Sequence, residues 1–533
     1  MGKVMKRTVH DQLTRSTDIS FPTADRSAAP THQKWLVPLI LLAGCAFLYL
    51  QVFVLPDIPH VASGDQAIYL HHAARMLEGQ LIYRDYDHFT TPGTDVLYAA
   101  LFKLFGVKAW IPQAMLILIG VLTAWLVVEI SKKVITGSAA FLPAFLFLTL
   151  PYTSYLDATH HWYSTLAGTT ALAVVMEKRT ESRLLWAGLF WGLGVCFTQS
   201  VALGALGLAL FLAWENYRGD EKWSTLIKKE CFLFAGFLSP IVAFDGYFVW
   251  KVGLKRFLYF TVVFVAKYYP ADYFNNFRVY MTGRPSIHSW ANWPDLVTFC
   301  FIHALIPLIY VLFFVRWWRE RWRRDEPWDR LMLVNITGLS SLTSVALAPA
   351  YSRLYVVSPP ALVLLVWFLK PLFKPEKILT RSAWVSVLAL AIARPIVTQA
   401  RWKAVLNLPT GRTVFFEPVL YEKCKWVSER TQPSDYFFGD HLVAFTLRLR
   451  NVARVPFLRP TDYTRPEEVQ DALQAIEKYQ VRFVSWYNGL DHEAEAVLHP
   501  AGDHLGPMRS YLHEHYHVAK VFSNGDQIWE RNN

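Results

Sequence analysis

Cysteine is scarce in this sequence, with five residues among 533. Only Cys424 lies in a polar region, and no two cysteines are spaced as a CxxC pair; the others, in or beside apolar runs, are Cys45, Cys196, Cys231 and Cys300. This usage excludes a disulfide framework and a paired-cysteine metal site. The C-terminal part also lacks a glycine-rich phosphate loop and a catalytic triad, so it is predicted to be an accessory domain that helps to capture an acceptor.

Charged residues are also few, at 18% of the chain, whereas 53% of the residues are hydrophobic and 15% are aromatic. The mean hydropathy of +0.22 is high for a soluble protein. This composition is typical of a membrane protein with several spans. The net charge of +11 could suggest nucleic acid, but the basic residues fall in short blocks between apolar runs. Such blocks are topology signals, and no nucleic-acid partner is expected.

Long apolar runs alternate with these polar blocks. The run 35–56 is too long for a signal-peptide core and lacks a small-residue cleavage site, so it is predicted to stay as the first span. With roughly 17–25 residues for each crossing, the chain contains about eleven candidate spans. The fifth and sixth form one apolar block, which we fold back at "TQS" (198–200). The spans lie near 36–55, 110–131, 135–151, 160–176, 184–199, 200–216, 231–250, 295–315, 329–348, 354–370 and 383–399.

Lys and Arg gather in alternate loops, which places the N-terminus in the cytoplasm by the positive-inside rule. An odd number of spans then puts the C-terminal region on the far side. We therefore predict an integral membrane protein, of a bacterial inner or plasma membrane, in three parts. These parts are a cytoplasmic tail (1–34), a membrane domain (35–400) whose first extracytoplasmic loop covers 56–109, and a soluble extracytoplasmic domain (401–533).

The first extracytoplasmic loop carries many ionisable residues directly behind the first span. From Asp65 onward apolar residues recur at helical spacing, which predicts an amphipathic helix lying along the membrane surface. The turn "TPGTD" (91–95) starts a second helix that stops at Gly106. Two interfacial helices joined by an acidic, aromatic linker are therefore expected.

The last 130 or so residues differ in pattern from the membrane domain, because short β-rich runs alternate with helical stretches. This alternation predicts a small α/β domain with a partly parallel sheet. The β-rich runs are 434–440, 481–487 and 517–524, and the helical stretches are 417–430 and 465–480.

Five stretches of the membrane domain resemble the GT-C glycosyltransferases, in particular bacterial members related to protein O-mannosyltransferases and the lipid A aminoarabinose transferase. They are "GDQAIY" (64–69), "TPGTDVLYAALFKLFG" (91–106), "YTSYLDATHHW" (152–162), "AGLFWGLGVCFTQ" (187–199) and "RLYVVSPP" (353–360). The sequence departs from the family pattern at two positions. Gln66 stands where Glu is usual, and Thr198 stands where Lys is common.

This resemblance implies a mainly α, GT-C type membrane helix bundle with interfacial loop helices and a C-terminal extracytoplasmic α/β domain. It also implies a glycosyltransferase that moves a sugar from a polyprenyl-phosphate donor to a lipid, glycan or protein hydroxyl, by an inverting displacement at the extracytoplasmic face. The donor, the acceptor and membrane lipid are thus the expected partners. No cofactor is assigned with certainty, although a divalent cation that bridges Asp85 and Asp87 to the donor phosphate stays open.

The chemistry of such a transfer needs a carboxylate to take the acceptor proton and a positive charge to hold the departing phosphate. Asp65 is predicted to be the general base, and Asp157 a second carboxylate that orients the acceptor or helps to hold a cation. Arg353 is predicted to bind the donor phosphate. The further substrate-binding candidates are Arg84 and Lys267 for the phosphate, His160 and His161 for the acceptor side, and the motif residues Tyr69 and Gln199.

Each residue also has a plainer interpretation. Asp65 precedes an amphipathic helix and is also suited to capping it, Asp157 is equally typical of a surface loop, and Arg353 can snorkel to lipid headgroups. The adjacent pairs His71–His72 and His160–His161 point about 100° apart on a helix and do not make a chelate, so no zinc site is expected from them. Asp85 and Asp87 are predicted to solvate the linker.

Two other function classes remain open at this stage. A transporter or flippase would require internal repeats or ionisable residues within the spans, and Asp245 is the best feature in its favour. A non-catalytic envelope scaffold would only present the soluble domain.

Overall fold

The computed structural model describes residues 32–61, 64–219, 222–285, 292–323, 325–372, 378–455, 457–488, 490–491 and 502–532. The chain divides into two compact units, residues 1–43 and 44–533. The proposed cytoplasmic tail (1–34) lies almost wholly outside the described residues, and the division into tail, membrane domain and soluble domain stays a prediction. The candidate site lies in the second unit.

Each of the eleven apolar runs is a helix or a short series of helices. The fifth and sixth runs do separate where the sequence predicts, because α7 ends at Phe197 and α8 starts at Ala202, after a 3₁₀ turn. The helices are α1 (His32–Val52), α4 (Trp110–Ser131), α5 (Leu142–Phe147), α6 (His160–Val175), α7 (Glu181–Phe197), α8 (Ala202–Gly219), α9 (Trp223–Pro240), α10 (Gly246–Val252), α14 (Trp293–Glu320), α15 (Trp328–Val345), α16 (Tyr351–Val356), α17 (Ser358–Leu369) and α18 (Ile378–Ala400).

Several of these helices can cross a membrane. Within the described residues, five helical segments are long and apolar enough for a crossing: Trp110–Ser131, Gln199–Gly219, Trp223–Val252, Trp293–Glu320 and Arg381–Ala400. Three shorter apolar segments accompany them, at Val37–Val52, Gly137–Tyr152 and Ser358–Leu369. The protein is therefore an integral membrane protein with several transmembrane helices, while the count of eleven stays a prediction.

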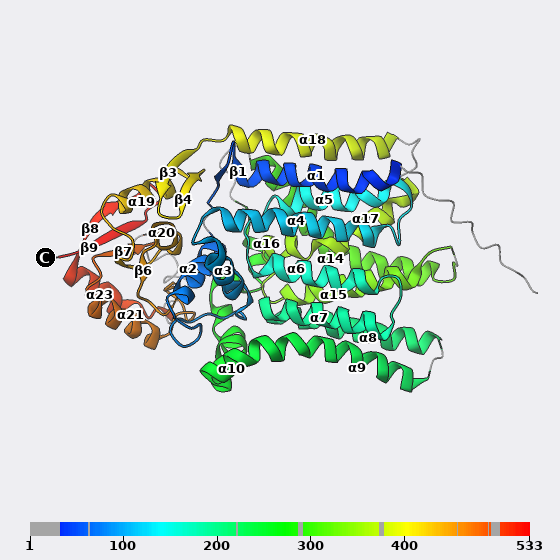
Figure 1. Cartoon of the computed structure of the whole chain (residues 1–533), viewed down its shortest axis with the longest axis horizontal. Coiled ribbons are helices and arrows are strands. Elements are labelled where there is room, and N and C mark those ends of the chain that lie inside the picture. The colour runs from blue at the N-terminus through cyan, green and yellow to red at the C-terminus, as the bar shows by residue number, and fades with distance from the viewer. Residues whose placement is uncertain are drawn as a thin grey trace, which may run out of the picture. The chain divides into compact units, whose positions relative to one another are not determined.

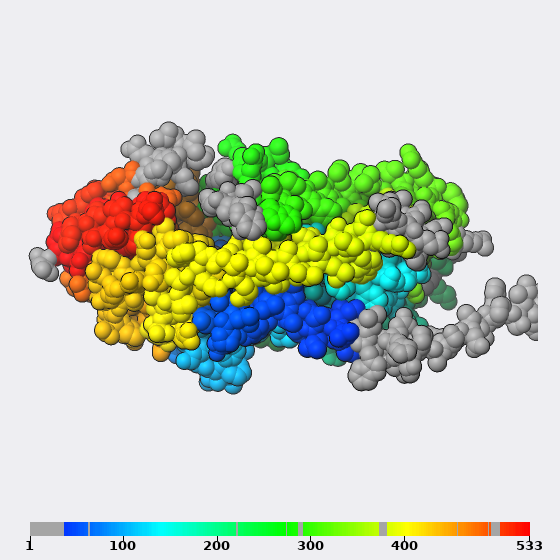
Figure 2. Space-filling view, turned by 90° about the horizontal axis from the view of Figure 1, so that it is seen from above, coloured from blue at the N-terminus to red at the C-terminus, as the bar shows by residue number. Residues whose placement is uncertain are grey.

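The apolar surface of α18 supports this conclusion. Its large side chains Val385, Leu388, Ile392 and Ile396 are between 49% and 65% exposed. Figure 2 shows this helix, in yellow, running uncovered along one face of the molecule. A helix with an exposed apolar face is stable in lipid, where such side chains need no protein partner.

Glycines let some membrane helices pack with their backbones in contact. The neighbours α4, α6, α7 and α9 run side by side (Figure 1). A Cβ added to Gly188 of α7 would overlap the carbonyl oxygen of Leu233 in α9, and one added to Gly236 would overlap that of Leu185. Close backbone approach through small residues is a common way for membrane helices to associate without a hydrophobic driving force.

The two helices expected in the first loop are present as α2 (Asp65–Leu77) and α3 (Gly93–Phe105). Gly64 occupies the N-cap position of α2, and Asp65 is the first helical residue, so the interpretation of Asp65 as the helix cap is wrong. A two-stranded turn, β1 (Phe53–Val54) with β2 (Ile58–Pro59), leads into α2. The positions of α2 and α3 relative to a membrane surface stay a prediction.

The C-terminal region is the α/β domain that the sequence predicts, with a five-stranded mixed sheet in the order β6-β5-β7-β9-β8. β5 pairs in parallel with β6 and β7, and the remaining pairs are antiparallel. A separate hairpin joins β3 (Ala404–Leu408) to β4 (Gly411–Phe415). The sheet strands are β5 (Tyr436–Phe438), β6 (Arg450–Asn451), β7 (Phe483–Trp486), β8 (Tyr516–Val521) and β9 (Gln527–Arg531), and the helices are α19 (Pro418–Ser428), α20 (His441–Leu447), α21 (Pro466–Lys478) and α23 (Gly506–His515).

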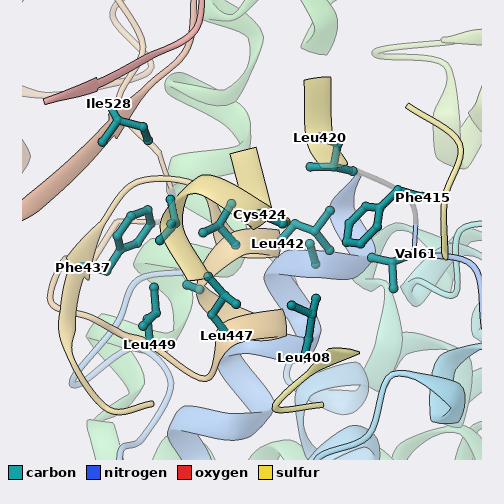
Figure 3. Packing of buried hydrophobic residues seen from close by; sticks show 14 of the residues in the cluster. Val61, Leu408, Phe415, Leu420, Cys424, Phe437, Leu442, Leu447, Leu449 and Ile528 are labelled. Carbon is teal, nitrogen blue, oxygen red and sulfur yellow. The ribbon is translucent and has the colours of Figure 1, made fainter. Parts of the chain in front are cut away.

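The first loop and the C-terminal domain share one hydrophobic core. Val61 and Ala67 from the loop belong to the same buried cluster as Phe415, Cys424 and Leu442 of the domain. Figure 3 shows Val61 beside Phe415 in this cluster. This core fixes the domain against the start of α2, where Asp65 lies.

Polar contacts strengthen the same interface. The guanidinium of Arg75 on α2 donates to the carbonyl oxygen of Ala453 at 2.8 Å. Asp87, which is buried, accepts from Arg454 at 3.1 Å. The expectation that Asp87 solvates the linker is therefore wrong, because its carboxylate forms an ion pair beneath the C-terminal domain.

Candidate active site

Two carboxylates meet at the start of α2. Asp157, in the loop between η2 (Leu148–Tyr152) and α6, accepts a 3.0 Å hydrogen bond from the backbone N–H of Gln66. The Gln66 side chain in turn accepts from the backbone N–H of Ala158 at 2.8 Å. Gly64 adopts φ +153°, and a Cβ there would stand 3.0 Å from Asp157 Oδ2. These contacts hold Asp157 beside Asp65, and Asp157 is therefore not simply a solvated loop residue.

The Asp65–Asp157 pair has unequal acidities. Burial and the neighbouring Asp65 carboxylate raise the pKa of Asp157 to about 8. The Asp65 carboxyl faces a cavity rather than bulk water, and this desolvation raises its pKa, although the positive charges of Arg353 and Arg459 offset part of that rise. Two nearby carboxylates in different environments hold a proton unequally. The two arginines therefore favour the charged form of Asp65, and the raised pKa of Asp157 favours its protonated form.

The departure from the family pattern at Gln66 has a physical reason here. Gln66 is only 3% exposed and lies against Asp157. A glutamate at this position would place a third carboxylate in the same buried cluster, with a large desolvation cost. The amide makes the bond to Ala158 without adding charge.

An apolar cavity of about 160 Å³, the inner cavity, opens between the membrane helices. Arg353 lines it, and its guanidinium donates to the Tyr269 hydroxyl at 2.6 Å, to Asn275 Oδ1 at 2.9 Å and to the Ala348 carbonyl at 2.8 Å. All three partners are neutral, and no described carboxylate lies within ion-pair distance of this guanidinium. Arg353 is thus held inside the protein without an ion-pair partner among the described residues, and its guanidinium is suited to bind an anion.

The polar end of the inner cavity also brings together four other predicted residues. His160 and His161 line it, with ring centroids 3.9 Å apart, and the Tyr69 hydroxyl is hydrogen-bonded to His160 Nδ1 at 2.5 Å. Gln199 also lines it, and its amide donates to the backbone of Phe89 and Thr261, at 2.9 and 3.0 Å. The Gln199 Oε1 atom is buried without a partner and remains an acceptor for a ligand.

A second, larger cavity of about 440 Å³, the outer cavity, lies between the start of α2 and the C-terminal domain. Asp65 lines it and is reached by solvent through it. Opposite α2, the domain contributes aromatic, amide and charged groups, among them Phe457, Arg459, Asp440, Trp486, Tyr487, Asn488 and Arg509. No sequence motif singles out these domain residues, because only the docking of the domain brings them to the cavity that Asp65 lines.

Two predicted phosphate ligands lie elsewhere. Lys267 is exposed and stacks over the Tyr268 ring, with its Nζ 4.9 Å from the ring centroid. Arg84 is exposed and pairs with its neighbour Asp85 at 2.7 Å, and Asp85 also accepts from the Leu81 N–H. Neither basic residue lines either cavity, since each is already engaged at the surface.

Comparisons with known proteins agree with this architecture. ArnT from Cupriavidus metallidurans bound to undecaprenyl phosphate superposes with a TM-score of 0.57 at 12% identity, covering 94% of this chain and 98% of that one. The archaeal oligosaccharyltransferase AglB from Archaeoglobus fulgidus, in complex with an inhibitory peptide and a dolichol-phosphate, gives 0.53 at 12% identity, covering 93% and 75%. No curated protein matches by sequence.

The chain thus shares the fold of these two proteins over nearly its whole length, which agrees with the resemblance predicted from the sequence motifs. Residues 90–244 also match the family described as dolichyl-phosphate-mannose-protein mannosyltransferase. That stretch starts at the end of the linker in the first loop and includes Asp157, His160, His161 and Gln199.

Proposed function

We propose that the protein transfers a sugar from a polyprenyl-phosphate donor to a hydroxyl group of a lipid, glycan or protein, at the extracytoplasmic face. The observation that carries this proposal is the position of Asp65. It lines the outer cavity, while the charge of Arg353, in the inner cavity, acts on its carboxyl group. Asp65, the proposed base, thus lines the cavity that opens to solvent, and its carboxyl group is influenced by a guanidinium in the cavity that suits an anion.

The inner cavity suits the donor. Its polar end offers Arg353 for the phosphate and Gln199 Oε1, an acceptor suited to a sugar hydroxyl, and its walls are mostly apolar side chains such as Leu172, Trp191 and Val356. A polyprenyl phosphate needs both features, since its head is an anion and its tail is a hydrocarbon. The solved relatives named above hold undecaprenyl phosphate and dolichol-phosphate, which supports this class of donor.

The outer cavity suits the acceptor. Flat aromatic faces at Trp486 and Tyr487, together with the Asn488 amide, match the apolar faces and hydroxyl groups of a sugar or glycolipid head. The predicted role of the C-terminal domain in acceptor capture rests on this lining. His160 and His161 were expected on the acceptor side, but they line the inner cavity with Arg353, so we reassign them to donor binding.

The reaction then needs one base and one cation. Asp65 takes the proton of the acceptor hydroxyl while the hydroxyl oxygen attacks the anomeric carbon of the donor. The bond between that carbon and the phosphate oxygen breaks, and the electron pair leaves with the polyprenyl phosphate. Arg353 stabilises the charge that develops on the phosphate. A single displacement of this kind inverts the anomeric centre, and Asp157 keeps Asp65 in place.

Consumption of donor tests the proposal. We expect purified protein in detergent or liposomes to release polyprenyl phosphate from radiolabelled polyprenyl-phosphate sugars when cell-envelope lipids and glycans are supplied. Heat-treated protein is the matched control. A transporter that uses Asp245, or a scaffold, would leave the donor intact, and the absence of turnover with a broad donor panel would contradict the proposal.

The pH dependence of transfer should respond to Arg459. The charge of this residue lowers the pKa of Asp65, so Arg459→Met should raise that pKa. Asp65 would then stay protonated, and unable to act as a base, up to a higher pH. The acid limb of the plot of kcat/KM against pH is therefore expected to move to higher pH, measured from about pH 5 to about pH 9.

Arg482→Met is the matched control for this shift. Arg482 is exposed and pairs with Glu530 at 2.8 Å, and it lines neither cavity. The plot of kcat/KM against pH for Arg482→Met should coincide with that of the unmodified protein. An acid limb that does not move in Arg459→Met would show that Arg459 has no influence on the base.

A further inference from the structure

Three buried side chains of the first loop converge at a point that the transfer reaction does not use. His72 comes from α2, His88 from the linker, and Asp95 from the first turn of α3. They are 0%, 4% and 0% exposed. One donor atom from each lies within 4.8 Å of the donor atoms of the other two.

Hydrogen bonds within the protein do not satisfy this cluster. His72 Nδ1 contacts Asp95 Oδ1 at 3.1 Å, and His88 Nδ1 contacts the Thr90 hydroxyl at 2.8 Å. His72 Nε2 and Asp95 Oδ2 are buried and have no hydrogen-bond partner among the residues that the structure describes. Buried polar atoms that lack a partner are rare and cost free energy, so two of them in one pair of residues indicate a missing ligand.

We propose that His72, His88 and Asp95 bind a divalent transition-metal ion, with Zn²⁺ as the best match. Two imidazoles and one carboxylate are a ligand set that zinc accepts, whereas Mg²⁺ and Ca²⁺ prefer oxygen ligands alone. Metal–ligand bonds of 2.0–2.1 Å place two tetrahedral ligands roughly 3.3 Å apart. The 3.1 Å between His72 Nδ1 and Asp95 Oδ1 shows that these two side chains already approach each other that closely.

The site differs from the pairs of adjacent histidines in the sequence. His71 and His72 do point apart: His71 Nδ1 contacts His441 Nδ1 at 3.1 Å, while His72 turns to Asp95. The ligands come instead from three separate segments, so the ion would tie α2, the linker and α3 together. Thr90 joins His88 to Tyr69, and Tyr69 contacts His160 in the inner cavity. The metal would therefore position the donor end of the site without touching substrate.

Metal content tests the assignment independently of transfer activity. Full-length protein, loaded with Zn²⁺ in detergent and passed through gel filtration, should retain about one equivalent per chain by mass spectrometry. His88→Ala and Asp95→Asn should each lose most of this zinc. His71→Ala, a neighbouring buried histidine outside the site, should keep it.

Two further readouts keep the test decisive if a variant folds poorly. Cobalt substitution should give the visible absorption of a tetrahedral site in the unmodified protein, and this absorption should be absent in Asp95→Asn, which preserves shape. A chelator should lower the Tm of the unmodified protein and leave that of Asp95→Asn unchanged. Protein without stoichiometric zinc, or His88→Ala with undiminished zinc, would overturn the proposal.

Discussion

Asp65→Asn should reduce sugar transfer by about 10²–10⁴-fold, the range expected when a positioned general base is removed. Asparagine keeps the shape of the side chain but cannot take the acceptor proton. Because Gly64, and not Asp65, occupies the N-cap position of α2, the change removes no helix cap. The loss should appear in kcat, measured with labelled donor at saturating acceptor.

The matched control for Asp65→Asn is Glu78→Gln, an amide substitution at the exposed C-terminal end of the same helix. It should keep full activity and the same Tm. Binding of the donor to Asp65→Asn should also persist, because Arg353 and the inner cavity are unchanged. Turnover close to that of the unmodified protein would remove Asp65 from the mechanism.

Asp157 should behave differently from Asp65, and this contrast follows from their contacts. Asp157 already accepts the backbone N–H of Gln66, and its pKa, raised to about 8, favours its protonated form. We expect Asp157 to hold the start of α2 and to leave the negative charge to Asp65. The two acids are therefore not interchangeable, although both stand in motifs that resemble the same family.

Local pattern sufficed for much of the fold. The apolar runs form helices, and α7 and α8 separate at the polar "TQS" triplet as predicted. Both features depend on residues that are adjacent in the sequence, so they can be predicted from it. The strands β5, β7 and β8 also fall in the predicted β-rich runs. The hairpin β3–β4 and the last strand β9 lie outside the predicted β-rich runs.

Long-range docking explains what the sequence could not provide. Asp65, Asp157, Arg353 and Gln199 were predicted from motifs, but Arg459 acts on Asp65 only because the C-terminal domain packs on Val61 and its neighbours. The cluster of His72, His88 and Asp95 was missed for the same reason. Spacing along one helix excludes a chelate from adjacent histidines, and it cannot reveal ligands that three segments supply together.

Arg353→Ala should lower transfer by about 10²–10³-fold, comparable with the loss of a group that stabilises a developing oxyanion. The inner cavity would keep its apolar walls but lose the charged contact that the Arg353 guanidinium provides for the donor phosphate. Both the KM for the donor and kcat are expected to suffer, while the KM for the acceptor stays within about twofold. Arg353→Lys should recover only part of the activity, because an ammonium group lacks the planar fork that meets Tyr269, Asn275 and a phosphate together.

A second consequence separates Arg353 from a purely structural residue. Its charge lowers the pKa of Asp65, so Arg353→Ala should also move the acid limb of the pH profile to higher pH. In the Asp65→Asn background the shift of the pH profile should disappear, and Arg353→Ala should then act only through the donor phosphate, on the donor KM and on the residual kcat. Arg183→Ala, at an exposed ion pair with Glu177, is the matched control and should change neither quantity. Unchanged kcat, donor KM and pH profile in Arg353→Ala would contradict the role of Arg353, because the base would then act without a cation to receive the leaving phosphate.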